Sequence, residues 1–122
     1  MSELSWGRRY LLCPPSHFGV LYEINPWMNR EVTVDRDAAQ SQWESLRGAL
    51  VAAGAEVELL APAAAVPDLV FTANAGVVNG RQFVASRFRH EERRGETALD
   101  VAWFSERGFE VSALPEDVCQ EG

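Results

Sequence analysis

The chain has 122 residues and 47% hydrophobic residues, which fits a single folded domain (1–122) and excludes a disordered segment. Its formal net charge of -7 argues against nucleic acid and anionic membranes as partners, because both need a basic face, and it fits either a solvated acidic surface, which is the more common case, or a small cationic ligand. No apolar run approaches the roughly 18 residues of a membrane span, and no signal peptide heads the chain, so a soluble cytoplasmic protein is expected.

The first half of the sequence predicts a strand, an extended segment, a helix and a second strand. "RRYLLCP" predicts a strand centred on Tyr10 to Leu12, which the prolines after it end. Apolar residues then follow helical spacing, with Asp35 as N-cap and Gly54 as the C′ stop. The apolar face of this helix consists of Ala39, Trp43, Leu46, Leu50 and Ala53. "AEVELL" follows as a strand.

The second half predicts a strand, a hairpin, a helix and a last strand. Leu69 to Thr72 reads as a short buried strand bounded by a proline and a glycine. Asn79-Gly80 between apolar runs predicts a type I′ hairpin with positive φ at both positions. A helix is expected from about Glu96 to Arg107, ending at Gly108, and "FEVSAL" is the last strand. The residues of this helix that are expected to face inward are Leu99, Ala102 and Trp103.

Two helices that each return to a strand at similar spacing indicate a repeated α/β unit. Trp27, Trp43 and Trp103 are interpreted as core residues. Cys13 and Cys119 are too far apart for a local metal motif and too few for a disulfide scaffold. Cys13 is expected to be a small core residue, and neither a metal nor a cofactor is expected.

The stretch "PDLVFTANAG" (67–76) places Asp68 and Asn74 at the two ends of the predicted strand. They either close turns or hold a ligand. The following run, 86–96, mixes arginines with glutamates, a pattern that is typical of a solvated helix start. Its arginines are Arg87, Arg89, Arg93 and Arg94.

Three segments in combination, "YEINPWM" (22–28), "PDLVFTANAG" (67–76) and "SRFRHEERRGE" (86–96), resemble the amidinotransferase and dimethylargininase-like group of guanidino-modifying enzymes. The resemblance implies a pentein fold, an α/β propeller of ββαβ units, of which this chain would supply roughly the first two. It also implies an arginine-like guanidino substrate. In the family a cysteine attacks the guanidinium carbon, a histidine shuttles protons, and acidic residues grip the guanidinium nitrogens.

Carried over residue by residue, the resemblance gives Asp68 the role of the substrate-gripping aspartate. Asn74 stands where dimethylargininases have a second acidic residue, which leaves the exact substrate open. The sequence as a whole also leaves open the choice between hydrolase and amidinotransferase. Arg87 and Arg89 lie where the family places an arginine for the substrate's α-carboxylate, and Glu121 lies close to its next acidic site residue. No residue here matches the family's nucleophilic cysteine or its histidine.

The sequence therefore predicts the substrate-binding N-terminal part of a guanidino-modifying enzyme whose Cys and His chemistry lies in a missing C-terminal part. The alternative is a non-catalytic α/β binding or interaction module. Because a part-propeller leaves strand edges uncovered, a homo-oligomer or a missing C-terminal half is expected to cover them.

Overall fold

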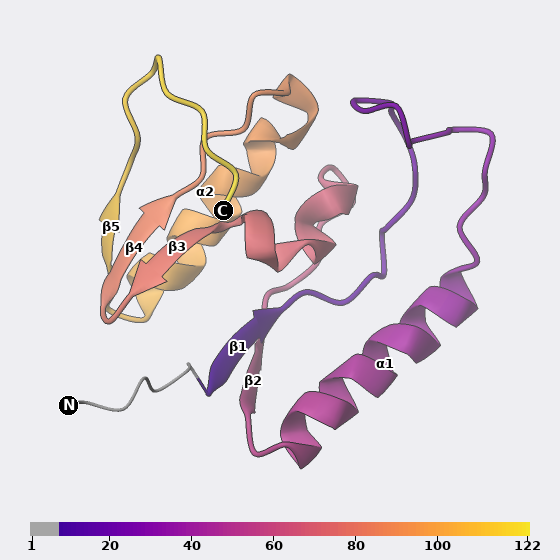
Figure 1. Ribbon diagram of the computed structural model, residues 1–122, viewed down its shortest axis with the longest axis horizontal. Helices are drawn as coiled ribbons and strands as arrows, with labels where there is room; N and C mark the ends of the chain where they lie inside the picture. Colours follow the sequence, from indigo (N-terminus) through magenta and orange to yellow (C-terminus); the bar gives the residue numbers. More distant parts are fainter. Residues whose placement is uncertain (1–7) are drawn as a thin grey trace.

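A computed structural model of the chain describes residues 8–122, which form two successive α/β units (Figure 1). In the first unit, strand β1 (Arg9–Leu12) leads through a long loop to helix α1 (Arg36–Ala52). Strand β2 (Glu56–Leu59) then returns parallel to β1 and pairs with it. This unit confirms the predicted strand, helix and strand.

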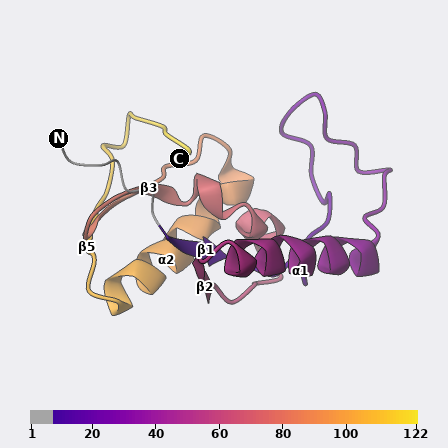
Figure 2. The same ribbon diagram turned by 60° about the horizontal axis from the view of Figure 1, so that its bottom comes forward.

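The second unit contains a three-stranded sheet in the order β3-β4-β5. Strands β3 (Gly76–Asn79) and β4 (Gln82–Ala85) form the antiparallel hairpin. Helix α2 (Glu91–Glu106) then carries the chain to β5 (Glu110–Ser112), which lies parallel to β4. The β1–β2 pair lies between α1 and this second unit in two views of the molecule (Figures 1 and 2).

Helix α1 begins and ends where the sequence predicts. The Asp35 side chain accepts a hydrogen bond from the Ala38 amide at 3.0 Å, and Gly54 takes the positive φ of +93° that favours glycine. Trp43 is buried as predicted, but Leu46 is 52% exposed and Ala53 is exposed as well. The prediction for Leu46 was wrong because only a narrow stripe of this helix is covered by the β1–β2 pair.

Helix α2 begins five residues before the predicted Glu96. Its buried face differs from the prediction, because Leu99 and Ala102 are exposed while Trp103 is buried. The buried positions of this helix are Arg93, Glu96, Asp100, Trp103 and Phe104. A largely polar buried face has a weak apolar periodicity, so the sequence pattern misplaced both the start and the face of the helix.

The turn of the β3–β4 hairpin also differs from the prediction. Asn79 pairs with Gln82, so the two turn residues are Gly80 and Arg81. Gly80 has a φ of +62°, but Arg81 does not have a positive φ, because every residue with positive φ in the described chain is a glycine. A type I′ turn needs positive φ at both central positions, so the hairpin is confirmed and the turn type is not.

The predicted strand at Leu69–Thr72 is wrong. The chain forms two short 3₁₀ turns there, η1 (Pro67–Val70) and η2 (Thr72–Asn74). Pro67 stands at the first position of η1, where its missing N–H costs nothing. The Phe71 amide donates to the Asp68 carbonyl at 3.0 Å, which closes the turn. The apolar Leu69 is buried all the same, so burial and not strand formation explains the apolar run.

The hydrophobic core lies between α2, the β4 strand and η1. Cys13 is buried in it, as predicted, whereas Trp27 in the long loop is 87% exposed and is not a core residue. Phe83 and Phe104 stack with ring centroids 3.8 Å apart. Other buried members are Leu60, Val66, Leu69, Ala75, Ala85 and Trp103. None of the helices in residues 8–122 has the length and apolarity that crossing a bilayer requires.

Candidate functional site

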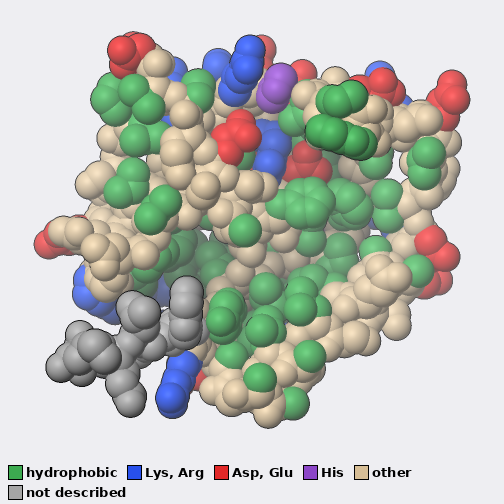
Figure 3. Space-filling view, viewed as in Figure 1, with side chains coloured by type: hydrophobic (Ala, Val, Ile, Leu, Met, Phe, Trp, Pro, Cys, Tyr) green, Lys and Arg blue, Asp and Glu red, His purple; other side chains and the backbone are tan. Residues whose placement is uncertain are grey.

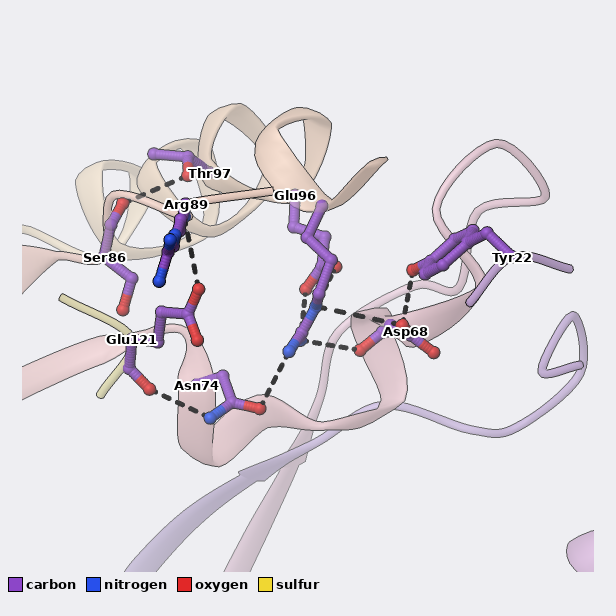
Figure 4. A network of polar contacts seen from close by, with 9 residues as sticks. Tyr22, Asp68, Asn74, Ser86, Arg89, Glu96, Thr97 and Glu121 are labelled. Atoms are coloured by element: carbon purple, nitrogen blue, oxygen red, sulfur yellow. Dashed lines mark hydrogen bonds and ion pairs between the residues drawn. The ribbon is translucent and has the colours of Figure 1, made fainter. Parts of the chain in front are cut away.

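A buried arginine is the centre of the polar network that joins α2 to the two 3₁₀ turns (Figure 4). Arg93 lies in the first turn of α2 and is 8% exposed. Its Nε and Nη2 atoms donate to the two carboxylate oxygens of Glu96 at 2.8 and 2.9 Å. This two-point geometry is the strong form of an arginine–carboxylate pair, and Glu96 itself is 2% exposed.

Asp68 and Asn74 approach the same guanidinium from η1 and η2. Arg93 donates through Nη1 to Asn74 Oδ1 at 3.1 Å and through Nη2 to the Asp68 carbonyl at 3.2 Å. The Asp68 carboxylate oxygen Oδ2 lies 4.0 Å from Arg93 Nε and accepts a hydrogen bond from the Tyr22 hydroxyl. Tyr22 thereby ties the long loop after β1 to η1 (Figure 4).

Aromatic rings cover the guanidinium. The Arg93 Cζ atom lies 4.5 Å from the centroid of the Phe88 ring and 6.0 Å from that of Phe71. Phe88 is fully buried. A desolvated guanidinium over an aromatic face gains cation–π attraction, which adds to the ion pair in holding Arg93 in one position.

The end of the chain reaches this network as well. Asn74 Nδ2 donates to the Glu121 carbonyl at 2.9 Å, and the Arg89 amide donates to Glu121 Oε1 at 3.2 Å. Next to them, Arg87 and Gln120 exchange backbone hydrogen bonds. Glu121 thus lies next to Asn74, from which it is 47 positions away in the sequence, and Asn74 and Asp68 both contact Arg93 (Figure 4).

The two predicted arginines lie at the margin of this group. Arg89 is exposed, and its backbone, not its guanidinium, contacts Glu121. Arg87 lines a separate cavity of about 330 Å³ together with Ser86, Thr97 and Val101. Its Nε atom is buried without a hydrogen-bond partner among the described residues. The structure therefore does not bring the Arg87 side chain to Asp68.

Sequence reasoning missed Tyr22, Arg93 and Glu96. The run 86–96 is not a solvated helix start at these positions, because Arg93 and Glu96 are both buried. If the helix had been predicted to begin at Glu91, the spacing of three residues between Arg93 and Glu96 would have placed both on one helix face. The contact of Tyr22 with Asp68 spans 46 positions and has no local signal.

The buried charges of this region do not balance. Within residues 8–122, Asp68, Glu96 and Asp100 are buried carboxylates and Arg93 is the one buried cation. Burial raises the pKa of Asp100 to about 7, helped by the charge of Glu96 and opposed by Arg93. Burial also raises the pKa of Glu96, against the hydrogen bonds from Arg93.

Cys13 does not have the surroundings of a nucleophile. Burial, with the charges of Asp100 and Glu96, raises the pKa of the Cys13 thiol to about 11, so the reactive thiolate is scarce at neutral pH. Cys119 is exposed. Across residues 8–122 no three His, Cys, Asp or Glu side chains gather as metal ligands.

Solved structures share this fold. The crystal structure of the N-terminal domain of ArgZ bound to product, described as an arginine dihydrolase, matches with a TM-score of 0.86 and 46% identity over 95% of this chain and 42% of that chain. A dimethylarginine dimethylaminohydrolase adduct matches with a TM-score of 0.74 at 20% identity, which shows the fold alone. The chain is therefore similar to a part of these guanidino-modifying enzymes, which for ArgZ lies in the N-terminal domain.

Two of the similar curated proteins are arginine-modifying enzymes. The chain is 47% identical over 115 residues to the bifunctional arginine dihydrolase/ornithine cyclodeaminase ArgZ of Synechocystis sp., covering 93% of this chain and 16% of ArgZ. It is 42% identical over 102 residues to the N(G),N(G)-dimethylarginine dimethylaminohydrolase of Mycobacterium tuberculosis, covering 84% of this chain and 34% of that enzyme. The chain thus spans less than half of each relative. No family model matches it.

Proposed function

We propose that this chain is the substrate-binding N-terminal part of a hydrolase that acts on arginine or a close guanidino relative. The complete enzyme would fold as a pentein propeller, and the two units described here would be the first of its series of ββαβ units. The observation that carries the proposal is the polar network that joins Asp68, Asn74 and Glu121, in which Asp68 and Asn74 contact Arg93 and Asn74 donates to the Glu121 carbonyl. Relatives named as arginine dihydrolase and dimethylarginine dimethylaminohydrolase favour hydrolysis over amidino transfer.

The geometry divides the proposed roles by depth. Glu121 is exposed, so its carboxylate is the acceptor that an entering guanidinium reaches first, whereas the half-buried Asn74 already accepts a hydrogen bond from Arg93. Asp68 is buried, and its carboxylate accepts a hydrogen bond from Tyr22 and lies near the Arg93 guanidinium. Its negative charge still favours a cation at the mouth of the site, because a buried charge is poorly screened by solvent.

The carboxylate end of an amino-acid substrate needs a cation on the same face. We assign this role to Arg89, because its side chain is exposed and its backbone amide donates to Glu121. Arg87 is the weaker candidate because its side chain lines the separate cavity beside Ser86. A zwitterionic substrate would then bridge an acidic and a basic end of one surface.

The first prediction is that the 122-residue chain alone does not hydrolyse L-arginine. Its buried Cys13 stays a thiol, and the proposed nucleophile and histidine lie outside the chain. Incubation of the chain with L-arginine should release no ornithine, citrulline or ammonia above a blank. Turnover that disappears in Cys13→Ser or Cys119→Ser would show that the assignment is wrong.

The second prediction concerns Asp68 in the assembled enzyme. The assembly joins this chain with a complementing fragment, defined as the part of the Synechocystis ArgZ N-terminal domain that follows the matched region. Asp68→Asn should lower kcat/KM for L-arginine by about 10- to 100-fold, because a charge-assisted interaction of about 1.5–3 kcal/mol is lost. The amide keeps the size and one acceptor for Tyr22, so the denaturation midpoint should change little.

The matched control is Asp117→Asn, which removes the same charge from an exposed position in the C-terminal loop. It should leave kcat/KM unchanged. An Asp68→Asn chain that unfolds would identify Asp68 as a structural turn residue instead. An assembly that binds L-arginine without turning it over would support the alternative, a non-catalytic binding module.

A further inference from the structure

The Asp68 carboxylate is held by the protein through one of its two oxygens. Its Oδ2 atom accepts the hydrogen bond from the Tyr22 hydroxyl and lies 4.0 Å from Arg93 Nε. The other oxygen, Oδ1, accepts no hydrogen bond from residues 8–122. Because Asp68 is almost completely buried, these few contacts decide how the carboxylate is turned. One oxygen is thus fixed by the protein, and the other is left for a ligand.

Arg93 competes with Tyr22 for this carboxylate. Four of the N–H donors of Arg93 bond to Glu96, Asn74 and the Asp68 carbonyl. One further donor, on Nη1, has no partner among the described residues, since each Nη atom of a guanidinium carries two N–H groups. A carboxylate free to rotate beside this guanidinium would close on it, because charge-assisted hydrogen bonds are strong where water is scarce. The negative charge of Asp68 would then be neutralised within the protein.

The Tyr22 hydroxyl is a permanent donor at neutral pH. Burial, the hydrogen bond to Asp68 and the charge of Asp68 raise the pKa of Tyr22 above its ordinary value of 10, with a smaller contribution from Glu96, while Arg93 opposes the shift. The hydroxyl therefore keeps its proton at neutral pH and can hold a carboxylate oxygen in one direction.

Two aromatic residues attach the loop 18–34 to the candidate site. Tyr22 contacts Asp68 in η1, and the Phe18 ring meets the Phe71 ring edge-on, with the ring centroids 5.5 Å apart. Phe71 is the residue that joins η1 to η2. On the face of the molecule that Figure 3 shows, acidic and basic side chains lie close together and next to hydrophobic ones. The ring contact and the hydrogen bond together keep the Tyr22 hydroxyl against Asp68.

We propose that Tyr22 is a positioning residue of the site, whose hydroxyl holds Asp68 Oδ2 away from Arg93 so that Oδ1 stays open to the guanidinium of an arginine-like substrate. This inference rests on the proposed function and adds to it a residue that acts on the substrate through Asp68. Without the hydroxyl, the substrate would have to break an Asp68–Arg93 pair before it binds.

Tyr22→Phe removes the hydroxyl and keeps the ring. In the assembly with the complementing fragment, this variant should raise KM for L-arginine about ten-fold and change kcat by less than about two-fold, because the lost interaction serves the bound substrate and the transition state alike. A purely structural defect would lower the fraction of active enzyme, and so kcat, without raising KM. A KM equal to that of the wild type overturns the proposal.

The matched control is Tyr10→Phe, which removes the same hydroxyl from the other tyrosine of the chain, in β1. It should leave both KM and kcat unchanged. In the Asp68→Asn background, Tyr22→Phe should change KM by no more than about two-fold, because its effect passes through the carboxylate that is already lost. A full ten-fold increase in that background as well would contradict the proposal. An inactive wild-type assembly contradicts the proposed function, whereas an active assembly whose KM does not respond to Tyr22→Phe contradicts only the role of Tyr22.

A spectroscopic measurement tests the contact without turnover. In a Tyr10→Phe chain, Tyr22 is the one tyrosine left, so the ultraviolet absorbance of tyrosinate reports its ionisation. Adding Asp68→Asn should lower the midpoint of this titration by about one pH unit, because the hydrogen bond to a carboxylate and the charge of that carboxylate both raise the pKa of Tyr22. Equal midpoints in the two chains would show that the Tyr22 hydroxyl does not bond to the Asp68 carboxylate, and the proposal would be wrong.

Discussion

Glu96→Gln should lower the free energy of unfolding by about 3 kcal/mol, because it leaves the buried Arg93 guanidinium without its charged partner. Arg93 donates two hydrogen bonds to Glu96, at 2.8 and 2.9 Å, and both side chains are almost completely buried. Its remaining hydrogen-bond acceptors, Asn74 Oδ1 and the Asp68 carbonyl, are uncharged, and the Asp68 carboxylate lies farther away, with Oδ2 at 4.0 Å from Arg93 Nε. Urea denaturation followed by tryptophan fluorescence measures the change.

Glu92→Gln is the control, since Glu92 is exposed on the same turn of α2. It should change the stability by about 0.5 kcal/mol or less. The double variant Arg93→Met with Glu96→Leu should recover only part of the stability lost in Glu96→Gln, because it removes the buried pair but leaves the buried Asp68 carboxylate without its cation. A Glu96→Gln chain as stable as the wild type would mean that Arg93 is solvated in solution.

In the assembled enzyme, the same double variant should lower the activity even where it restores stability to the fold. Arg93 holds Asn74 and the Asp68 carbonyl in place, so apolar replacements leave η1 and η2 without a shared anchor. This separation of stability from function is what distinguishes a positioning arginine from a purely structural ion pair.

Local signals in the sequence predicted the parts of the fold that local physics determines. The Asp35 N-cap, the glycines after both helices and the Asn79-Gly80 hairpin each satisfy backbone groups within a few residues. Helix α1 was placed well because its apolar residues follow a single helical face. These features depend little on the rest of the molecule.

The site was predicted only in part, because its contacts join distant segments. Asp68 and Asn74 were identified by their motif, but their partners Tyr22 and Arg93 lie 46 and 19 positions away. The apolar run between them was interpreted as a strand, since burial of Leu69 gives the same composition in a 3₁₀ turn. Charged residues on the buried face of α2 were misread as solvated because charges are rarely buried without partners.

Asp100 should make the stability of the fold depend on pH between about 4 and about 7. The side chain is 1% exposed, and neither carboxylate oxygen has a hydrogen-bond partner among the described residues. Burial raises its pKa from the ordinary value of 3.8 to about 7, with Glu96 adding to the shift and Arg93 on the same helix opposing it. The thiol of Cys13 is the other titratable group coupled to it, and it stays protonated in this range.

The direction of the effect follows from which state binds the proton. Between pH 4 and 7 the folded chain keeps a proton on Asp100 that the unfolded chain has released, so stability falls as the pH rises through this window. A pKa shift of this size corresponds to a loss of about 4 kcal/mol of stability between the two ends of the window.

Asp100→Asn carries no titratable proton, so the difference in stability between it and the wild type should change by about this amount from pH 4 to pH 8. Asp117→Asn, at an exposed position, should instead give a curve parallel to the wild type. Urea denaturation of the three proteins across this range measures the differences, and an Asp100→Asn curve that also runs parallel to the wild type would show that Asp100 is ionised in the folded chain.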